Sequence, residues 1–219
     1  MQAKPRVRVN SFSLSLDGFG AGPQQSLQDP MGLGGMALHR WAMATRSFQQ
    51  THGADAAGGS TGVDDDFIAR SMQGVGAWVL GRNMFGPMRG PWPDDSWRGW
   101  WGDNPPYHVP VFVLTHHVRE PLVMDGGTTF HFVDDRIEAV LERAREAAGA
   151  LDVRIGGGVA TARDALRAKL VDDLHLAFAP VLLGAGENLF TGLDLPALGY
   201  TVKEHIATPA ATHVVLTRG

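Results

Sequence analysis

The hydrophobic and polar positions of this chain predict a layered protein in which strands and helices alternate. Apolar and polar residues alternate over residues 6–16, the pattern of a half-buried strand. Shorter apolar runs predict further strands at residues 75–80, 109–114, 128–133, 151–155 and 170–178. Apolar residues at helical spacing predict helices at residues 64–72 and 162–170, and one capped by Asp134 and Asp135. Residues 200–206 and 212–217 are typical of a closing antiparallel pair.

This order of elements predicts the fold class. Strands that alternate with helices favour a mostly parallel central sheet, covered by helices on both faces as a three-layer α-β-α sandwich. The last two strands add a C-terminal antiparallel hairpin. We expect residues 1–219 to form a single domain with a long loop insertion at residues 21–63, in which residues 37–48 form a short helical piece. A linker between two domains is disfavoured, because the lone strand before it cannot form a domain.

The clearest chemical signal is a glycine turn between a strand and a helix. Gly156, Gly157 and Gly158 follow the strand at residues 151–155 and precede a helical pattern. Glycines allow a ligand to approach the backbone, and the free N–H groups of a helix N-terminus favour an anion such as phosphate. The stretch is not a Rossmann fingerprint, because Thr161 stands where the third glycine belongs, and it is not a P-loop. A plain strand-to-helix connection is the alternative interpretation.

Two other predicted strands end in polar residues at the same edge of the sheet. Gly81 and Arg82 follow the strand at residues 75–80, and Thr115 and His116 follow the strand at residues 109–114. Ligands of open α/β sheets bind at the carboxyl ends of the strands, and arginine is well suited to phosphate. A dinucleotide laid across this edge would use all three loops. For Arg82, a surface salt bridge is the alternative.

Several residues upstream are candidates for a substrate site. Asp17 ends the first strand and is either a turn residue or part of a site. A predicted helix opens with three acidic residues, Asp64, Asp65 and Asp66. Capping of the free N–H groups at the helix start explains their presence, and the alternative interpretation is that one of them is a functional carboxylate. Residues 90–102 are rich in tryptophan, beginning with Trp92, and suit either a wall for a planar ligand or a subunit interface.

Composition narrows the possible functions. The formal net charge of −4 gives no broad basic surface for nucleic acid, and the absence of cysteine excludes disulfides and thiolate chemistry. No leader and no apolar run of about 20 residues is present, so we expect a cytoplasmic protein without a membrane segment. Histidine spacing predicts no metal site, and no Gly-x-Ser-x-Gly motif suggests acyl transfer.

In their order along the chain, these motifs resemble the dihydrofolate reductase superfamily. The similarity is carried by Leu80-Gly81-Arg82-Asn83-Met84-Phe85, Phe112-Val113-Leu114-Thr115 and Ile155-Gly156-Gly157-Gly158. The reductase domain of the bacterial bifunctional riboflavin biosynthesis deaminase-reductase is the most similar branch. Residues 13–18 and 170–186 resemble that branch, so the chain looks like a stand-alone relative.

The resemblance implies NADPH as cofactor and assigns its contacts. The adenosine-phosphate side of the cofactor would contact Gly81, Arg82, Asn83 and Met84. The adenosine would be bordered by Leu114, Thr115 and His116. The pyrophosphate would contact Gly156, Gly157, Gly158, Val159 and Ala160, with Thr161 nearby.

The substrate side follows from the same resemblance. The dihydrofolate reductase carboxylate corresponds best to Asp66, and the riboflavin branch places Asp17 beside the substrate; both are candidates for catalysis and for substrate binding. Trp92 is a candidate wall of the pocket. The insertion at residues 21–63 and the tryptophans at 97–101 depart from the shared pattern, which predicts a substrate of its own.

We therefore expect an NADPH-dependent reductase that transfers a hydride to the C=N or C=O group of a small heterocyclic, pterin-like or pyrimidine-like substrate. Two alternatives stay open: the 5-amino-6-(5-phosphoribosylamino)uracil reductase of riboflavin biosynthesis, and a non-catalytic relative that binds a nucleotide. A homodimer is expected from the riboflavin branch.

Overall fold

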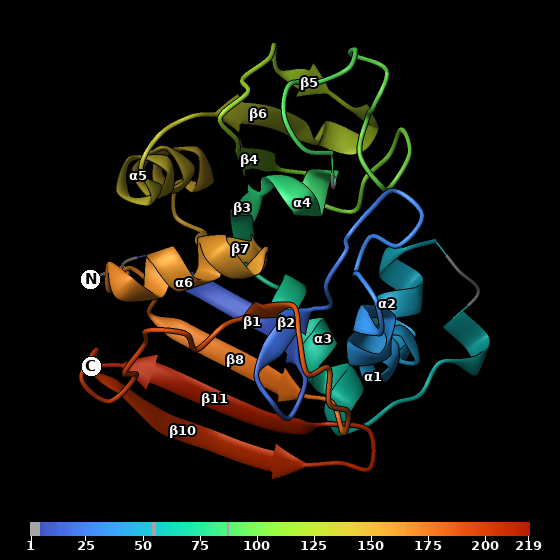
Figure 1. The fold of residues 1–219 in the computed structure, drawn as a ribbon, viewed down its shortest axis with the longest axis vertical. Helices are drawn as coiled ribbons and strands as arrows, with labels where there is room; N and C mark the ends of the chain where they lie inside the picture. The colour runs from blue at the N-terminus through green and yellow to red at the C-terminus, as the bar shows by residue number, and fades with distance from the viewer. Residues whose placement is uncertain (1–4, 54–55, 87) are drawn as a thin grey trace.

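A large central sheet organises the chain, and its parallel strands all end at one edge (Figure 1). The computed structural model describes residues 5–53, 56–86 and 88–219. Within them the strand order is β10-β11-β8-β1-β7-β3-β4-β6-β5. The parallel strands are β1 (Val7–Leu14), β3 (Val75–Gly81), β4 (Pro110–Leu114), β6 (Thr129–Val133), β7 (Asp152–Gly157) and β8 (Asp173–Phe178).

Antiparallel strands complete both ends of this sheet. The short β5 (Leu122–Val123) pairs with β6, and the hairpin of β10 (Tyr200–Ala207) and β11 (Thr212–Arg218) pairs with β8 through β11. A separate two-stranded sheet joins β2 (Phe19–Ala21) to β9 (Glu187–Asn188).

Helices cover both faces, in keeping with the continuous burial along the central strands β3 and β4. The helices are η1 (Gly35–His39), α1 (Arg40–Met43), α2 (Arg46–Thr51), η2 (Ala56–Gly58), α3 (Val63–Met72), α4 (Arg82–Phe85), η3 (Asp125–Gly127), α5 (Ile137–Ala148) and α6 (Val159–Arg167). Ala77 and Val79 of β3 face the core beneath α5 and α6, whereas Trp78 and Leu80 face the opposite side. Successive strand residues point to opposite faces, so both faces of β3 are buried.

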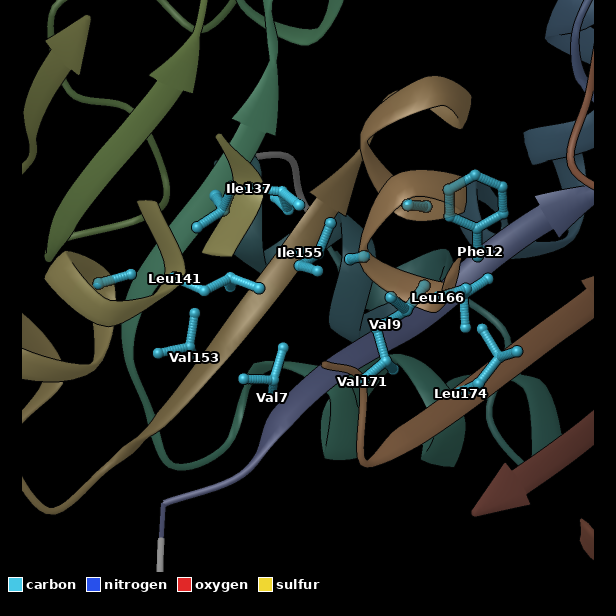
Figure 2. Close-up of a cluster of buried hydrophobic side chains, with 14 of the residues drawn as sticks. Val7, Val9, Phe12, Ile137, Leu141, Val153, Ile155, Leu166, Val171 and Leu174 are labelled. Carbon is cyan, nitrogen blue, oxygen red and sulfur yellow. The ribbon is translucent and has the colours of Figure 1, made fainter. Parts of the chain in front are cut away.

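The main core lies between α5, α6 and the centre of the sheet (Figure 2). Val9 of β1 and Ile155 of β7 lie next to each other in register, and neither is exposed to solvent. Leu141 of α5 and Leu166 of α6 pack over them. The opposite face is covered by α1 and α3 over β8, where Trp41 and Ile68 contact Ala177.

A bulge in β1 supports a buried polar chain beneath α3. Ser11 adopts φ 55°, and its N–H donates to Nδ1 of His175 at 3.1 Å. Since Nδ1 of His175 accepts this bond, its Nε2 carries the proton and donates to Nδ1 of His213 at 3.0 Å. Nε2 of His213 then donates to Asp64 at 2.7 Å. Phe67 stacks on both imidazoles, so the chain joins α3 to β1, β8 and β11.

The predicted α-β-α sandwich with its C-terminal hairpin is confirmed, and several local predictions are corrected. The insertion at residues 21–63 begins at the end of β2 and contains η1, α1, α2 and η2, so it is more ordered than a loop. Residues 54 and 55 of the insertion lie outside the described residues, as does Pro87. The helix after the glycines begins at Val159 and not at residue 162, and β8 begins at Asp173 and not at residue 170.

The acidic residues that open α3 and α5 do not act as N-caps. Gly62 is the N-cap of α3 and Arg136 that of α5, and neither gives a side-chain cap bond. Asp64 instead accepts from His213, and Asp65 accepts from the backbone N–H of Ser47 at 2.7 Å. Contacts with the neighbouring elements thus replace the predicted capping.

Acidification is expected to destabilise the fold through His175. Burial, together with nearby His213, Arg70 and Arg154, lowers the pKa of His175 from 6.5 to about 3. Between these values the unfolded chain binds a proton that the folded chain excludes, so the free energy of unfolding falls as pH decreases. We expect His175 alone to account for a loss of roughly 1 to 2 kcal/mol between pH 7 and pH 5 in urea unfolding.

The variant His175→Gln tests the source of this effect. It removes the titrating group, so its unfolding free energy is expected to change less with pH than that of the wild type. The unfolding free energy of His175→Gln still depends on pH, since burial also lowers the pKa of His39 to about 4. Exposed His205 gives the matched control, His205→Gln. Identical slopes in wild type and His175→Gln would exclude His175 as the source.

Candidate functional site

The exit of β3 and the start of α6 touch each other at the carboxyl edge of the sheet. A methyl group placed on Gly81 would lie 2.6 Å from Oγ1 of Thr161 and 3.2 Å from the backbone nitrogen of Gly158. Only a residue without a side chain fits such an approach. The structure thus brings together two of the loops that the sequence predicts to bind one ligand.

The glycine turn is shaped by its neighbours as well as by its own conformation. A Cβ on Gly156 would lie 2.6 Å from the Leu80 side chain, and Gly157 adopts φ +136° with Met84 directly beside it. The peptide bond between Gly157 and Gly158 is cis. Gly158 is the N-cap of α6, and no side chain caps the helix. The first N–H groups of α6 therefore have no intrahelical acceptor and favour an anion.

A cleft of about 850 Å³ runs along this edge. Its lining includes nine of the predicted cofactor residues: Gly81, Arg82, Asn83, Leu114, Thr115, His116, Gly158, Ala160 and Thr161. The remaining predicted residues lie close behind the lining: Gly156 and Gly157 end β7, Met84 packs on Gly157, and Val159 is buried at the start of α6. The three predicted loops thus converge on one cleft.

Arg82 presents unpaired donors at this cleft. Its Nη1 donates to Oγ1 of Thr115 at 3.2 Å, and its guanidinium lies 3.8 Å from the centre of the Trp92 ring. Its Nε and Nη2 atoms are shielded from solvent, and no described residue accepts from them. Burial and the nearby guanidinium groups of Arg119 and Arg89 lower the pKa of Arg82. An anion would satisfy both donors and offset the repulsion.

Two other basic residues of the cleft, His116 and Arg167, already have acidic partners. His116 is exposed and pairs through Nδ1 with Asp134 at 2.9 Å, and Arg167 lies 3.7 Å from Asp164 on α6. Arg82 differs from both, because no described carboxylate contacts it. Among the lining cations with described contacts, Arg82 is therefore the strongest candidate for binding an anionic ligand.

Trp92 lies on the cofactor side of the structure and not beside the acidic candidates. Its Nε1 donates to the carbonyl of His117 at 2.6 Å, and Arg82 and Arg119 both stack on its ring. The contacts place Trp92 behind Arg82, so they do not support the predicted substrate wall. Trp97 has a structural contact instead, as its Nε1 donates to the carbonyl of Phe85 at 2.8 Å.

The carboxylate of Asp17 holds a neighbouring loop. It accepts from the backbone N–H groups of Leu183 at 3.1 Å and Gly184 at 2.7 Å. The Ser15 hydroxyl and these N–H groups lower the pKa of Asp17, so the carboxylate stays ionised at neutral pH. Of the two interpretations of Asp17, these contacts favour the turn residue that positions the loop after β8.

The three acidic residues of α3 differ in their surroundings. Asp64 bonds to His213 and Thr208, and Asp65 bonds to the Ser47 backbone. The exposed carboxylate of Asp66 contacts no described donor, so it is the one of the three that is free for a ligand. Asp66 does not line the cleft described above.

A second cavity of about 780 Å³ adjoins the cleft around the first turn of α6. The two share Ala160 and Glu187. Arg163 and Thr191 also line the second cavity, and the shielded Nε of Arg163 has no partner among the described residues. The cavity therefore combines a guanidinium, a hydroxyl and the aromatic rings of Phe19 and Phe190.

Sequence analysis missed the residues that act through tertiary packing. Arg119 lies beyond the strand-end motif, yet its guanidinium is 4.6 Å from the Trp92 ring and stacks against Phe132. His175 and His213 were not singled out, because their pairing depends on β8 and β11 being neighbours. The only signal in the sequence was for Arg119, which is a second arginine placed shortly after a strand end.

Two further findings concern a possible metal site and a possible membrane-spanning helix. Within the part of the chain that the structure describes, no three His, Asp or Glu side chains are placed to hold a metal ion. No helix there is both long enough and apolar enough to cross a membrane.

The sheet order and the cleft at its carboxyl edge define an α/β protein of the dihydrofolate reductase-like class. Residues 5–214 match the family described as the RibD C-terminal domain, and the chain belongs to this family. No curated protein sequence matches the chain at a significant level.

Solved structures share this fold at low sequence identity. A Shewanella sp. PV-4 protein assigned to riboflavin biosynthesis matches with a TM-score of 0.57 and 22% identity over 99% of both chains. The diaminohydroxyphosphoribosylaminopyrimidine deaminase/5-amino-6-(5-phosphoribosylamino)uracil reductase of Thermotoga maritima matches with a TM-score of 0.55 and 14% identity. The match covers 99% of this chain but 57% of the Thermotoga protein.

A third likeness is to a pyrimidine reductase-like protein from Corynebacterium diphtheriae. The TM-score is 0.51 and the identity 14%, over 97% of this chain and 91% of that one. At these identities the comparisons establish the fold, while the function is argued from the site itself.

The contact between Gly81 and α6 predicts a large effect of a single methyl group. Gly81→Ala is expected to lower the free energy of unfolding by roughly 1 to 3 kcal/mol, because the new Cβ meets Thr161 and the Gly158 backbone. Thermal unfolding measures the change. Gly58→Ala is the control, since nothing lies within 4 Å of a Cβ there. Equal melting temperatures for the two variants would contradict this packing.

Proposed function

We propose that this protein is an NADPH-dependent reductase of a small heterocyclic substrate. The observation that carries the proposal is the pair of unpartnered, shielded donors on Arg82, which line the same cleft as the uncapped N-terminus of α6. These are two anion-binding features in a single groove. A dinucleotide with a phosphate on its adenosine ribose and a pyrophosphate further along carries anions at both places.

The residues of the cleft fit this cofactor in detail. Arg82 would bind the ribose phosphate, while Thr115 orients the guanidinium through its hydroxyl. The free N–H groups at the start of α6 would bind the pyrophosphate, and the glycines before them leave room for its approach. When bound, NADPH supplies the hydride.

The proposed substrate side lies near the exit of β1 and the start of α3. Asp66 has a free carboxylate that can orient a nitrogen heterocycle or relay a proton. Asp17 is ionised and bound to Leu183 and Gly184, so its role is to hold the loop after β8 and not to donate the proton. The 5-amino-6-(5-phosphoribosylamino)uracil reductase activity belongs by name to the Thermotoga relative and is the second candidate.

One feature of the second cavity favours that second candidate. A phosphorylated substrate needs a cation, and the sequence shows no basic cluster for it. Arg163 supplies a shielded, unpartnered Nε beside Thr191, close to the start of α6. A guanidinium and a hydroxyl together suit a phosphate.

A binding and turnover assay tests the proposal. NADPH is titrated into the protein by fluorescence, and oxidation is followed with dihydrofolate, a quinonoid or imine-type pterin, and 5-amino-6-ribosylaminouracil with and without its phosphate. Binding with turnover of one heterocycle supports the reductase. Binding without oxidation of any substrate favours a non-catalytic nucleotide-binding relative, and no binding at micromolar protein overturns both.

Arg82→Ala is expected to separate the two nicotinamide cofactors. Loss of a charge-assisted contact to a ribose phosphate should raise the Kd of NADPH by roughly 10- to 100-fold and leave that of NADH nearly unchanged. Isothermal titration with both cofactors measures this. Arg40→Ala, at an exposed arginine of α1, serves as the control. Equal losses for NADPH and NADH would refute the phosphate contact.

A further inference from the structure

The insertion after β2 reaches across the carboxyl edge of the sheet to the proposed cofactor site. We name residues 22–33 the strap. It leaves β2 beside β1, and its Gln25 contacts Asn83 in the first turn of α4, directly after β3. Because β7 lies between β1 and β3, the strap spans the end of β7, where the glycine turn lies. In Figure 1 the blue segment after β2 runs towards α4.

The strap is closed on itself at its base. Gly22 donates its N–H to the carbonyl of Met31, and Leu33 donates to the carbonyl of Pro23, each at 2.9 Å. A Cβ on Gly32 would lie 2.2 Å from the carbonyl oxygen of Gly22, so the two chain segments pass in direct contact. This closure holds the tip of the strap in place without help from a ligand.

The strap also fixes the side chain of Gln25 in a single orientation. Nε2 of Gln25 donates to the carbonyl of Pro30 at 3.1 Å. A backbone carbonyl can only accept, so the nitrogen of this amide must point at Pro30, and Oε1 must point away from it. Oε1 then accepts from Nδ2 of Asn83 at 2.9 Å.

The same reasoning orients Asn83. One of the two N–H groups on its Nδ2 donates to Gln25, and no described residue donates to its Oδ1. Asn83 lines the cofactor cleft, and Oδ1 is its side-chain polar atom without a described partner, so an acceptor oxygen is available there. An acceptor repels phosphate oxygens and attracts a hydroxyl.

We propose that Gln25 is a positioning residue that turns the Asn83 amide so that its oxygen recognises a sugar hydroxyl of the bound dinucleotide. This inference rests on the proposed function. It changes the role of Asn83 from a phosphate contact to a hydroxyl contact. It also gives the insertion a purpose in cofactor binding, since the strap supplies the residue that selects the orientation.

A double-mutant cycle on NADPH binding tests the inference. Gln25→Ala is expected to raise the Kd about 3- to 10-fold, mostly through faster dissociation in stopped-flow experiments, because the Asn83 amide is free to rotate. Asn83→Ala is expected to weaken binding as much, and the double variant no more than Asn83→Ala alone. Gln25→Glu keeps an acceptor for Nδ2 of Asn83 and should bind better than Gln25→Ala. Gln28→Ala, at an exposed glutamine of the same strap, is the control.

The outcomes separate this inference from the proposed function. Additive losses in the cycle, or an unchanged Kd in Gln25→Ala, overturn the positioning role while NADPH binding by the wild type stands. A lower melting temperature of ligand-free Gln25→Ala with additive losses indicates a merely structural role. In a crystal structure of the NADPH complex, a phosphate oxygen bonded to the Asn83 amide overturns the hydroxyl contact. No NADPH binding by the wild type overturns both proposals.

Discussion

The close approach of Gly81 to the start of α6 is the constraint on which the site depends. The loop after β3 and the turn after β7 meet without side chains between them, and a single methyl group on Gly81 would force them apart. This contact exists because β3 and β7 are parallel neighbours that end at the same edge. It places the Arg82 guanidinium and the free N–H groups of α6 in one cleft. The anion-binding character of the site therefore follows from sheet order and from two glycine positions.

Two arginines show how the fold treats a shielded cation. Both Nη atoms of Arg154 of β7 donate to backbone carbonyls, those of Ser71 and Asn10, so only its Nε is unpaired, even though burial lowers its pKa to about 9. Arg82 has a threonine and an aromatic ring for partners and keeps two donors unpaired. Unpaired donors in a shielded position are costly unless a ligand satisfies them. The contrast separates a structural arginine from one that is available for binding.

The sequence predicted the layers of the fold because burial on both faces of each strand leaves a local pattern. It predicted the three loops because glycine, arginine and threonine directly follow apolar runs. It did not reveal the pairing of His175 with His213, the stacking of Arg119 on Trp92 or the bond from Asn83 to Gln25, since each depends on elements brought together only in the folded sheet. The contact of Trp92 with Arg82 was hidden for the same reason, although the aromatic character of Trp92 is visible in the sequence. The substrate residues are the least determined, because Asp66 has no described partner that indicates its role.

Amide hydrogen exchange with and without NADPH tests the central claim most directly. The account predicts slower exchange on NADPH addition in three separate segments, 81–84, 114–117 and 158–162, with the strap at 22–33 also protected. The edge strand β10, at the far end of the sheet, should be unchanged. Protection confined to one of the three loops, or located on β10 or α5, would contradict a dinucleotide bound across the carboxyl edge.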